Sequence, residues 1–251
     1  MAELAEIVRF LDRELNTAGI SDYPGAWNGL QVANDGEVHR VIAAVDASWP
    51  VIEKAAEGGP GLLIVHHGLF WQGVQPVTGA FRRKLKTALN AGLAIYSSHL
   101  PLDVHPEWGN NRLLADAIGL RDQEPFLPGK SGAMGIRGTW QGNRESLAAA
   151  VGSAVGGPVH VCPAGPEKIL TVGLVTGGAG SEVAAAAAAG IDAFVTGEGP
   201  HWSYTLAEEV EINVLYAGHY ATETFGVRRL LNVVSANWGI PNDFIHHPTG
   251  L

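Results

Sequence analysis

Short apolar runs alternate with helical patterns along nearly the whole chain, and this alternation limits the fold more than any other feature. Runs of this length suit strands, and the segments between them have the periodicity of amphipathic helices. The order strand, helix, strand is typical of an α/β fold with a mainly parallel sheet. The predicted strands are 40–45, 61–65, 93–98, 133–140, 158–162, 169–175, 192–197 and 213–218, and the predicted helices are 2–17, 49–57, 80–91, 110–118, 144–155, 181–189, 201–210 and 222–236.

An internal repeat suggests that the fold consists of two similar α/β halves produced by duplication. The stretch RVIAAVDASWPVIEKAAEGGPGLLIVHHG resembles KILTVGLVTGGAGSEVAAAAAAGIDAFVTGEG, and AIYSSHLPLD resembles VLYAGHYATE. The Pro- and Gly-rich segment 124–135 is the best boundary candidate. We therefore predict an N-terminal half, 1–124, and a C-terminal half, 125–251. The prediction allows the two halves to interleave at their boundary. The matched polar pairs are His67 with Glu198, His99 with His219, and Asp103 with Glu223.

Ligand-type side chains follow several of the predicted strands. Polar residues at the carboxyl ends of parallel strands face the crevice where ligands bind in open α/β sheets. One histidine there is more often structural than a ligand, but five ligand-type residues in this position favour a metal site between the two halves. Glu223 lies four residues after His219, on the same face if a helix starts there. The five residues are His66, His67, His99, Glu198 and His219.

The adjacent pair His66 and His67 is better suited to two nearby ions than to one, because successive side chains diverge as they leave a strand. So few imidazoles and carboxylates cannot fill two coordination shells unless an oxygen bridges the ions and some positions stay open. Open positions are what metal catalysis requires. The other histidines at positions 39, 105, 160 and 201 are interpreted as surface or structural residues.

Composition excludes several classes of protein. The formal net charge is −9 and no Lys/Arg cluster occurs, which disfavours a nucleic-acid partner. No apolar stretch reaches the ~18 residues of a membrane helix, and the N-terminus lacks the apolar region of a signal peptide. The single cysteine, Cys162, fits a reducing compartment. We therefore expect a cytoplasmic protein without a membrane partner.

Five motifs, taken in order, resemble the NIF-three-like family, dinuclear-metal proteins often labelled GTP cyclohydrolase type II homologues. The chain looks like the short bacterial form, and the resemblance spans nearly its whole length. It implies two similar α/β halves, a two-metal site built from both, and a toroidal homo-hexamer. The motifs are NGLQV at 28–32, IVHHGLFW at 64–71, SHLPLDVHPEWGNN at 98–111, DAFVTGE at 192–198 and AGHYATETFGV at 217–227.

The resemblance also implies a ligand set for two divalent ions per chain. Glu223 would be the bridging ligand, and His99 would lie near the metals without being needed to hold them. His246 and His247 stand where relatives have an Asp-containing stretch, so no role is transferred to them. The donor types suit Zn, Fe, Mn, Ni or Co alike. The implied ligands are His66, His67, Asp103, His219 and Glu223.

Two classes of function fit these residues. The first is a dinuclear metal-dependent hydrolase that acts on a C–N, amide or phosphate bond of a small molecule such as a nucleotide. In this interpretation His99 is a proton shuttle or a substrate contact; the alternatives are that it orients Asp103 or is itself a ligand. The second class is a non-catalytic metal-binding or protein-interaction module in a hexameric assembly. The sequence leaves open whether the protein is an enzyme.

Overall fold

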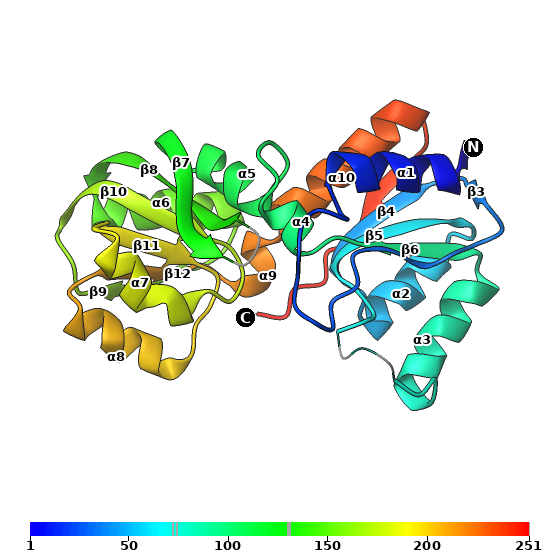
Figure 1. Cartoon of the computed structure of the whole chain (residues 1–251), viewed down its shortest axis with the longest axis horizontal. Coiled ribbons are helices and arrows are strands. Elements are labelled where there is room, and N and C mark those ends of the chain that lie inside the picture. The colour runs from blue at the N-terminus through cyan, green and yellow to red at the C-terminus, as the bar shows by residue number, and fades with distance from the viewer. Residues whose placement is uncertain (72, 74, 130–131, 251) are drawn as a thin grey trace. The chain divides into compact units, whose positions relative to one another are not determined.

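The chain forms two compact units that do not follow the order of the sequence. In this computed structural model, which describes residues 1–71, 73, 75–129 and 132–250, the first unit contains Met1–Leu102 and Gly226–His247. The second unit contains Asp103–Phe225 and the tail from Pro248. The backbone passes from one unit to the other inside helix α4 (Leu100–Asp103), at the start of helix α10 (Thr224–Trp238), and again between His247 and Pro248 (Figure 1).

The first unit is built on a five-stranded sheet with the strand order β13-β4-β5-β6-β2. Strands β13, β4, β5 and β6 are parallel, and β2 pairs antiparallel with β6. Helices α1 and α10 lie along one face of the sheet, and α2 and α3 along the other (Figure 1). The bounds are α1 Leu4–Glu14, β2 Gly29–Val32, β4 Val41–Asp46, α2 Trp49–Ala56, β5 Gly61–His67, α3 Gly79–Asn90, β6 Leu93–Ser97 and β13 Asn242–Phe244; β1 Ala2–Glu3 and β3 Glu37–Val38 form a separate two-stranded sheet.

Strand β5 is buried on both faces, which explains why its sequence is continuously apolar rather than alternating. Leu63 and Val65 are fully buried in the cluster that also contains side chains from α2 and α3. Leu62 and Ile64, which alternate with them along the strand, are fully buried as well. A strand covered on both sides is held rigidly, and it ends in the two histidines.

The second unit contains a six-stranded mixed sheet with the order β7-β8-β10-β11-β12-β9. Strands β10, β11 and β12 are parallel, whereas β7 with β8, β8 with β10, and β9 with β12 pair antiparallel. The bounds are α5 Asn110–Ala117, β7 Arg121–Gly129, β8 Gly132–Asn143, α6 Arg144–Val155, β9 His160–Pro163, β10 Lys168–Val175, the 3₁₀ turn Gly180–Glu182, α7 Val183–Ala188, β11 Ala193–Thr196, α8 His201–Glu209, β12 Asn213–Tyr216 and α9 His219–Thr222.

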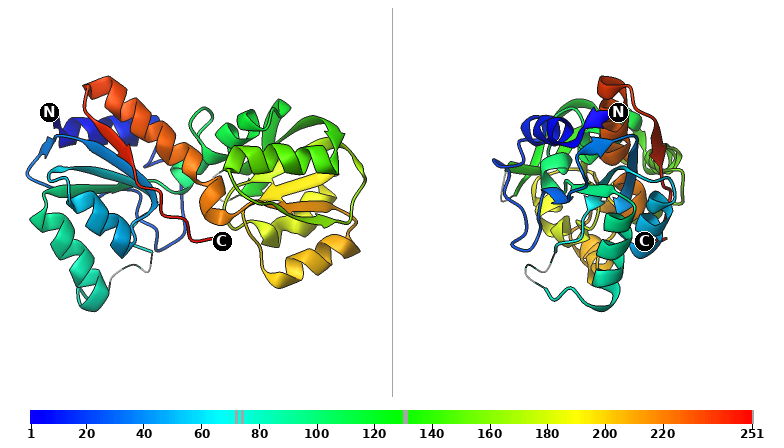
Figure 2. Two further views of the ribbon diagram at one scale, coloured as in Figure 1. Left: turned by 180° about the vertical axis from the view of Figure 1, so that it is seen from behind. Right: turned by 90° about the vertical axis from the view of Figure 1, so that its right-hand side faces the viewer.

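Two apolar clusters cover the two faces of this sheet. One joins the sheet to α5 and α6, and the other joins it to α7 and α8; Figure 2 shows α6 lying across one face. Neighbouring residues of one strand belong to different clusters: Leu174 of β10 faces the first and Val175 the second. This alternation follows from the two-residue period of a strand.

Both units contain the same arrangement of consecutive elements. Three parallel strands in the order β4-β5-β6 have α2 and α3 between them, and β10-β11-β12 have α7 and α8 between them. In each unit the third strand is flanked by an antiparallel strand from earlier in the chain, β2 or β9. The duplication itself stays a prediction, but the repeated topology is what a duplication would produce.

Each of the eight predicted strands and eight predicted helices coincides with an observed element. The prediction of mainly parallel strands holds for the first unit, whereas the second has a mixed sheet. The elements that were not predicted are the short strands β1, β2, β3 and β13, the edge strand β7, and the one-turn helices α4 and α9. No helix in the described ranges is both long and apolar enough to cross a membrane.

The units divide the chain differently from the halves 1–124 and 125–251. Apart from residues 130 and 131, which lie outside the described residues, the proposed boundary segment forms the end of β7 and the start of β8, inside the second unit. Pro125 and Pro128 fit there because β7 is an edge strand, where a missing N–H breaks no ladder on the outer side. Residues 226–247 belong to the first unit because β13 pairs with β4.

The burial on β10 leads to a stability prediction. Leu174 is fully buried, whereas Leu170 on the same strand is 51% exposed. We expect Leu174→Ala to lower the free energy of unfolding by about 2–5 kcal/mol, since it removes apolar contacts and leaves a cavity. Leu170→Ala is the matched control and should change it by no more than about 0.5 kcal/mol. Urea unfolding of the full chain measures both, and similar losses would contradict the assigned core.

Candidate metal centre

His66 lies near the end of β5 and is fully buried. Its Nδ1 atom is 2.9 Å from the backbone oxygen of Ser98, directly after β6. A carbonyl oxygen only accepts hydrogen bonds, so Nδ1 must carry the proton and donate it. In the neutral ring the lone pair then resides on Nε2, which is the form of histidine that binds metal ions.

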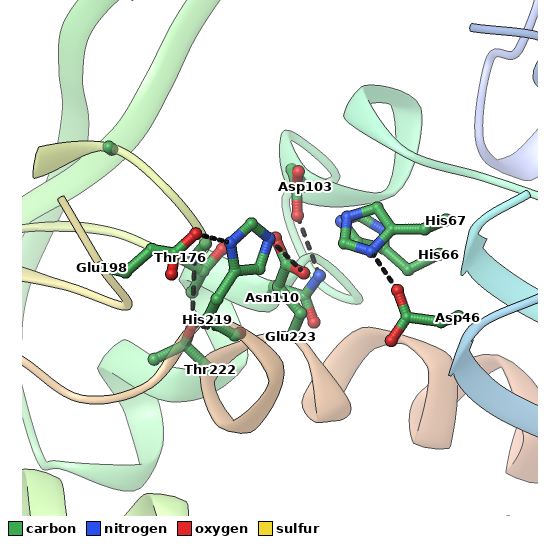
Figure 3. Close-up of polar contacts among 12 residues, drawn as sticks. Asp46, His66, His67, Asp103, Asn110, Thr176, Glu198, His219, Thr222 and Glu223 are labelled. Carbon is green, nitrogen blue, oxygen red and sulfur yellow. Dashed lines mark hydrogen bonds and ion pairs between the residues drawn. The ribbon is translucent and has the colours of Figure 1, made fainter. Parts of the chain in front are cut away.

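His67, the last residue of β5, is oriented by a carboxylate on the neighbouring strand. Asp46 ends β4 and lies beside His67 in the parallel register. The Asp46 Oδ1 atom accepts a hydrogen bond from Nδ1 of His67 at 2.8 Å (Figure 3). A carboxylate on Nδ1 fixes the tautomer and makes Nε2 a better ligand, as is common for metal-bound histidines.

His99 follows β6 and is held in the same way by Asp22. Its Nδ1 atom lies 2.9 Å from Oδ1 and 3.1 Å from Oδ2 of Asp22. Burial alone would raise the pKa of Asp22, but the hydrogen bond and charge interaction with His99, with further hydrogen bonds from Asn28 and the Tyr23 backbone, lower this pKa to about 2. Asp22 is therefore a carboxylate at neutral pH, and the His99 ring has a fixed orientation.

The three imidazoles of the first unit converge. One ring nitrogen of each of His66, His67 and His99 lies within 4.8 Å of those of the other two. The ring of Trp71 contacts His99 edge to face, with centroids 4.8 Å apart, and Tyr23 lies 5.9 Å from His99 on the same measure. Three oriented imidazoles with an aromatic surround form a cluster that could hold a divalent ion.

In the second unit, His219 at the start of α9 lies between two carboxylates. Its Nδ1 atom is 2.8 Å from Glu198 Oε1, and its Nε2 atom is 3.1 Å from Glu223 Oε2 (Figure 3). Burial would lower the pKa of His219, but the hydrogen bonds and charges of Glu223 and Glu198 raise it to about 9. The imidazole therefore holds a second proton, on the side that faces Glu223.

A divalent cation could replace the proton between His219 and Glu223. Two ligands about 2.0 Å from one tetrahedral ion stand roughly 3.3 Å apart, close to the 3.1 Å between His219 Nε2 and Glu223 Oε2. The carboxylate of Glu198 would keep the neutral ring oriented through Nδ1, as Asp46 does for His67. The donor types and their spacing in the second unit thus fit a metal ion.

Asp103, the last residue of α4, is fixed by the two asparagines that begin α5. Asn110 Nδ2 donates to Asp103 Oδ1 at 2.8 Å, and Asn111 Nδ2 donates to the Asp103 backbone oxygen at 3.2 Å. Asn111 Oδ1 in turn accepts from the backbone N–H of Thr176, directly after β10. This network anchors Asp103 to the carboxyl edge of the second sheet.

The glycine loop after β10 makes room for the His219–Glu223 pair. Gly177 has a φ of +71°, and a Cβ atom there would overlap with Oε1 of Glu223. The backbone oxygen of Gly177 accepts from the N–H groups of Gly197 and Glu198 at 2.9 and 3.0 Å. The loop therefore positions two of the predicted site residues.

The structure brings the predicted residues into two clusters, one in each unit. His66, His67 and His99 form the first; His219, Glu223 and the repeat-matched Glu198 form the second, and Asp103 is also in the second unit. Asp46 was not among the predicted site residues, although it ends an apolar strand as His67 does. Asp22 and Asn110 were not among them either, because they stand in a loop and at a helix start, where no comparable signal exists.

The fold and the clusters define an α/β protein with histidine and carboxylate groups that could bind metal. The family described as Duf34/NIF3 (NGG1p interacting factor 3) matches residues 2–249, and the chain belongs to this family.

Named relatives and solved structures agree with this membership. Proteins called "GTP cyclohydrolase 1 type 2 homolog" are 39% identical in Deinococcus radiodurans, over 98% of this chain and 94% of theirs, and 42% identical in Halobacterium salinarum, over 92% and 94%. A crystal structure of a protein from Thermus thermophilus covers all of both chains with a TM-score of 0.90 and 39% identity. Reduced HcgD from Methanocaldococcus jannaschii has a TM-score of 0.87 and 26% identity, over 98% of each chain.

The glycine loop provides a test of this local geometry. We expect Gly177→Ala to lower the free energy of unfolding by about 1–3 kcal/mol, because the new side chain is strained at positive φ and displaces Glu223. Gly178→Ala is the control, since its Cβ would meet no atom closer than 3.5 Å. Denaturant unfolding of both variants measures the difference, and equal stability of the two would refute the assigned packing.

Proposed function

We propose that the protein is a dinuclear metal-dependent hydrolase that acts on a small molecule, with a nucleotide as the favoured class. The observation that carries the proposal is the oriented imidazole: a carboxylate accepts a hydrogen bond from Nδ1 of His67 and of His219, which leaves Nε2 as the ring atom of each that would ligate a metal ion. Glu223 is the proposed bridge between two ions. The full set of proposed ligands is His66, His67, Asp103, His219 and Glu223.

Five protein ligands for two ions favour catalysis over a closed structural site, because substrate and water then have coordination positions left. When bound, two divalent ions supply Lewis-acid polarisation of the scissile group and make water more acidic. The residues of the chain supply orientation and proton transfer. The imidazole and carboxylate ligands suit Zn, Fe, Mn, Ni and Co equally well.

His99 is the proposed proton-transfer residue. Asp22 fixes the proton on Nδ1 of His99, so that Nε2 of the neutral ring is the basic atom. An Asp–His pair of this kind orients a general base and stabilises the imidazolium that forms when the base accepts a proton. The same pair would also suit a metal ligand, which is why metal content decides between the two roles.

The choice of substrate class rests on the relatives. Their name, "GTP cyclohydrolase 1 type 2 homolog", refers to a hydrolase and to a nucleotide, GTP. Hydrolysis of a C–N, amide or phosphate bond is within the chemistry of a two-metal site. The buried, single Cys162 suits the reducing cytoplasm, where we place the protein in this proposal.

Metal content tests the ligand assignment. We expect the purified chain to bind two divalent ions when metal is supplied, and His66→Ala or Glu223→Ala to bind fewer, because each removes a ligand. His39→Ala is the matched control, since His39 is exposed and pairs with Glu37. Elemental analysis after loading gives the stoichiometry; two ions in both ligand variants would remove the assignment.

Replacing His99 separates its possible roles. We expect His99→Gln to keep both ions but to reduce hydrolysis by about 10²- to 10⁴-fold, the usual contribution of general acid–base catalysis. The assay is turnover of a panel of nucleotides, phosphoesters and peptides by metal-loaded protein. Loss of one ion in this variant would show instead that His99 is a ligand. Absence of turnover by the wild-type protein on the whole panel would favour the non-catalytic metal-binding module.

We further propose that the protein forms a closed homo-oligomer, namely a hexamer. Large apolar side chains are exposed on the single chain, among them Trp27 at 62% and Trp202 at 49%. Exposed aromatic residues of this size are enriched in interfaces between subunits. Light scattering at micromolar concentration should give six times the chain mass of 26.4 kDa; a monomeric mass would contradict the proposal.

A further inference from the structure

A cavity of about 710 Å³ lies within the second unit, beside one of the carboxylates described above. This volume is in the range of small-molecule pockets. Its lining comes from the segment that enters β9, the loop between β11 and α8, the first half of α8, the end of β12 with Gly218, and Gly250 in the C-terminal tail. The described lining residues include no Lys or Arg, so the pocket does not suit the phosphate end of a ligand.

Three aromatic rings form one wall of the pocket. The plane of His160 is inclined by 36° to that of Tyr204 and by 31° to that of Tyr216, with centroid distances of 5.6 and 6.2 Å. The Ser203 hydroxyl donates to the Pro200 backbone oxygen at 2.6 Å, so the Tyr216 hydroxyl, 2.8 Å away, donates to Ser203. Tyr216 is therefore fixed in place, and the exposed imidazole of His160 offers a surface on which a planar ring can stack.

Glu198 provides a polar group at another side of the same pocket. Its Oε1 atom accepts from His219, but the side chain is 42% exposed. An ionised carboxylate has two oxygens with about four acceptor positions, so Glu198 retains capacity to accept from a ligand. Gly197 and Gly199, on either side of it, line the pocket without side chains.

We propose that this pocket binds the planar nitrogen heterocycle of the substrate. The ring stacks on the wall formed by His160, Tyr204 and Tyr216, and N–H groups at its edge donate to Glu198. The inference rests on the proposed function in that the bound ring would lie next to Glu198, which orients the proposed ligand His219. A guanine-type ring has the required combination of an aromatic face and adjacent N–H donors.

The test is equilibrium dialysis of the purified full chain with three probes. Guanosine has both the ring and the N–H donors, caffeine has a planar purine ring without N–H donors, and ribose has no aromatic ring. We expect guanosine to bind most tightly, caffeine more weakly, and ribose not at all. We also expect His160→Ala to weaken guanosine binding about ten-fold, since stacking on one aromatic side chain contributes this much to base binding.

His39→Ala is the control for an exposed histidine outside the pocket, and it should bind guanosine like the wild type. Guanosine binding that is absent, unchanged in His160→Ala, or equalled by caffeine or ribose would overturn the inference. Elemental analysis of the same preparations keeps this result separate from the proposed function. Guanosine binding without uptake of two ions would leave the pocket assignment standing and remove the dinuclear hydrolase; two ions without guanosine binding would do the reverse.

Discussion

The hydrogen bond from a histidine Nδ1 atom to a carboxylate is the interaction on which the candidate site depends. It occurs between His67 and Asp46 and between His99 and Asp22 in the first unit, and between His219 and Glu198 in the second. Each bond fixes the ring and the tautomer, so that the other nitrogen is presented in a defined direction. Without the carboxylates, the same histidines would be free to rotate or to exchange tautomers.

These pairs can be held rigidly because of where the sheets place them. Strands β4 and β5 end side by side in parallel register, which sets Asp46 beside His67. The apolar core on both faces of the sheet prevents the strand ends from shifting. In the second unit the backbone bonds from Gly197 and Glu198 to Gly177 tie two strand-end loops together. The site is therefore a consequence of sheet packing more than of loop conformation.

Glu198 links the two proposals made for the second unit. One oxygen accepts from His219, and its exposed side borders the aromatic pocket. A ligand that donates to Glu198 would share this acceptor with the His219 ring. Ligand binding in the pocket would therefore change the hydrogen bond that orients the proposed metal ligand His219. This coupling suits an enzyme in which the bound ring and the reacting bond belong to the same molecule.

The sequence by itself determined eight of the strands, among them the parallel strands at the candidate site, and the position of the ligand-type residues. A continuously apolar strand such as GLLIV is stable only when both of its faces are buried. His66 and His67 follow that run directly, so they lie at the carboxyl end of a strand. The repeat in the sequence likewise matched His67 with Glu198, and in the structure both lie just at or beyond a parallel strand.

The tertiary structure decided which carboxylates pair with the histidines and where the two units begin and end. Asp22 reaches His99 across 77 positions of the chain, and no local pattern encodes a contact of that range. Strand β13 pairs with β4 although it lies near the other end of the sequence, which places residues 226–247 in the first unit. The prolines of β7 indicated a linker, but they form an edge strand because the sheet leaves one side of it without a partner. Such outcomes depend on which surfaces meet when the chain folds, and a sequence read residue by residue contains only the local part of that information.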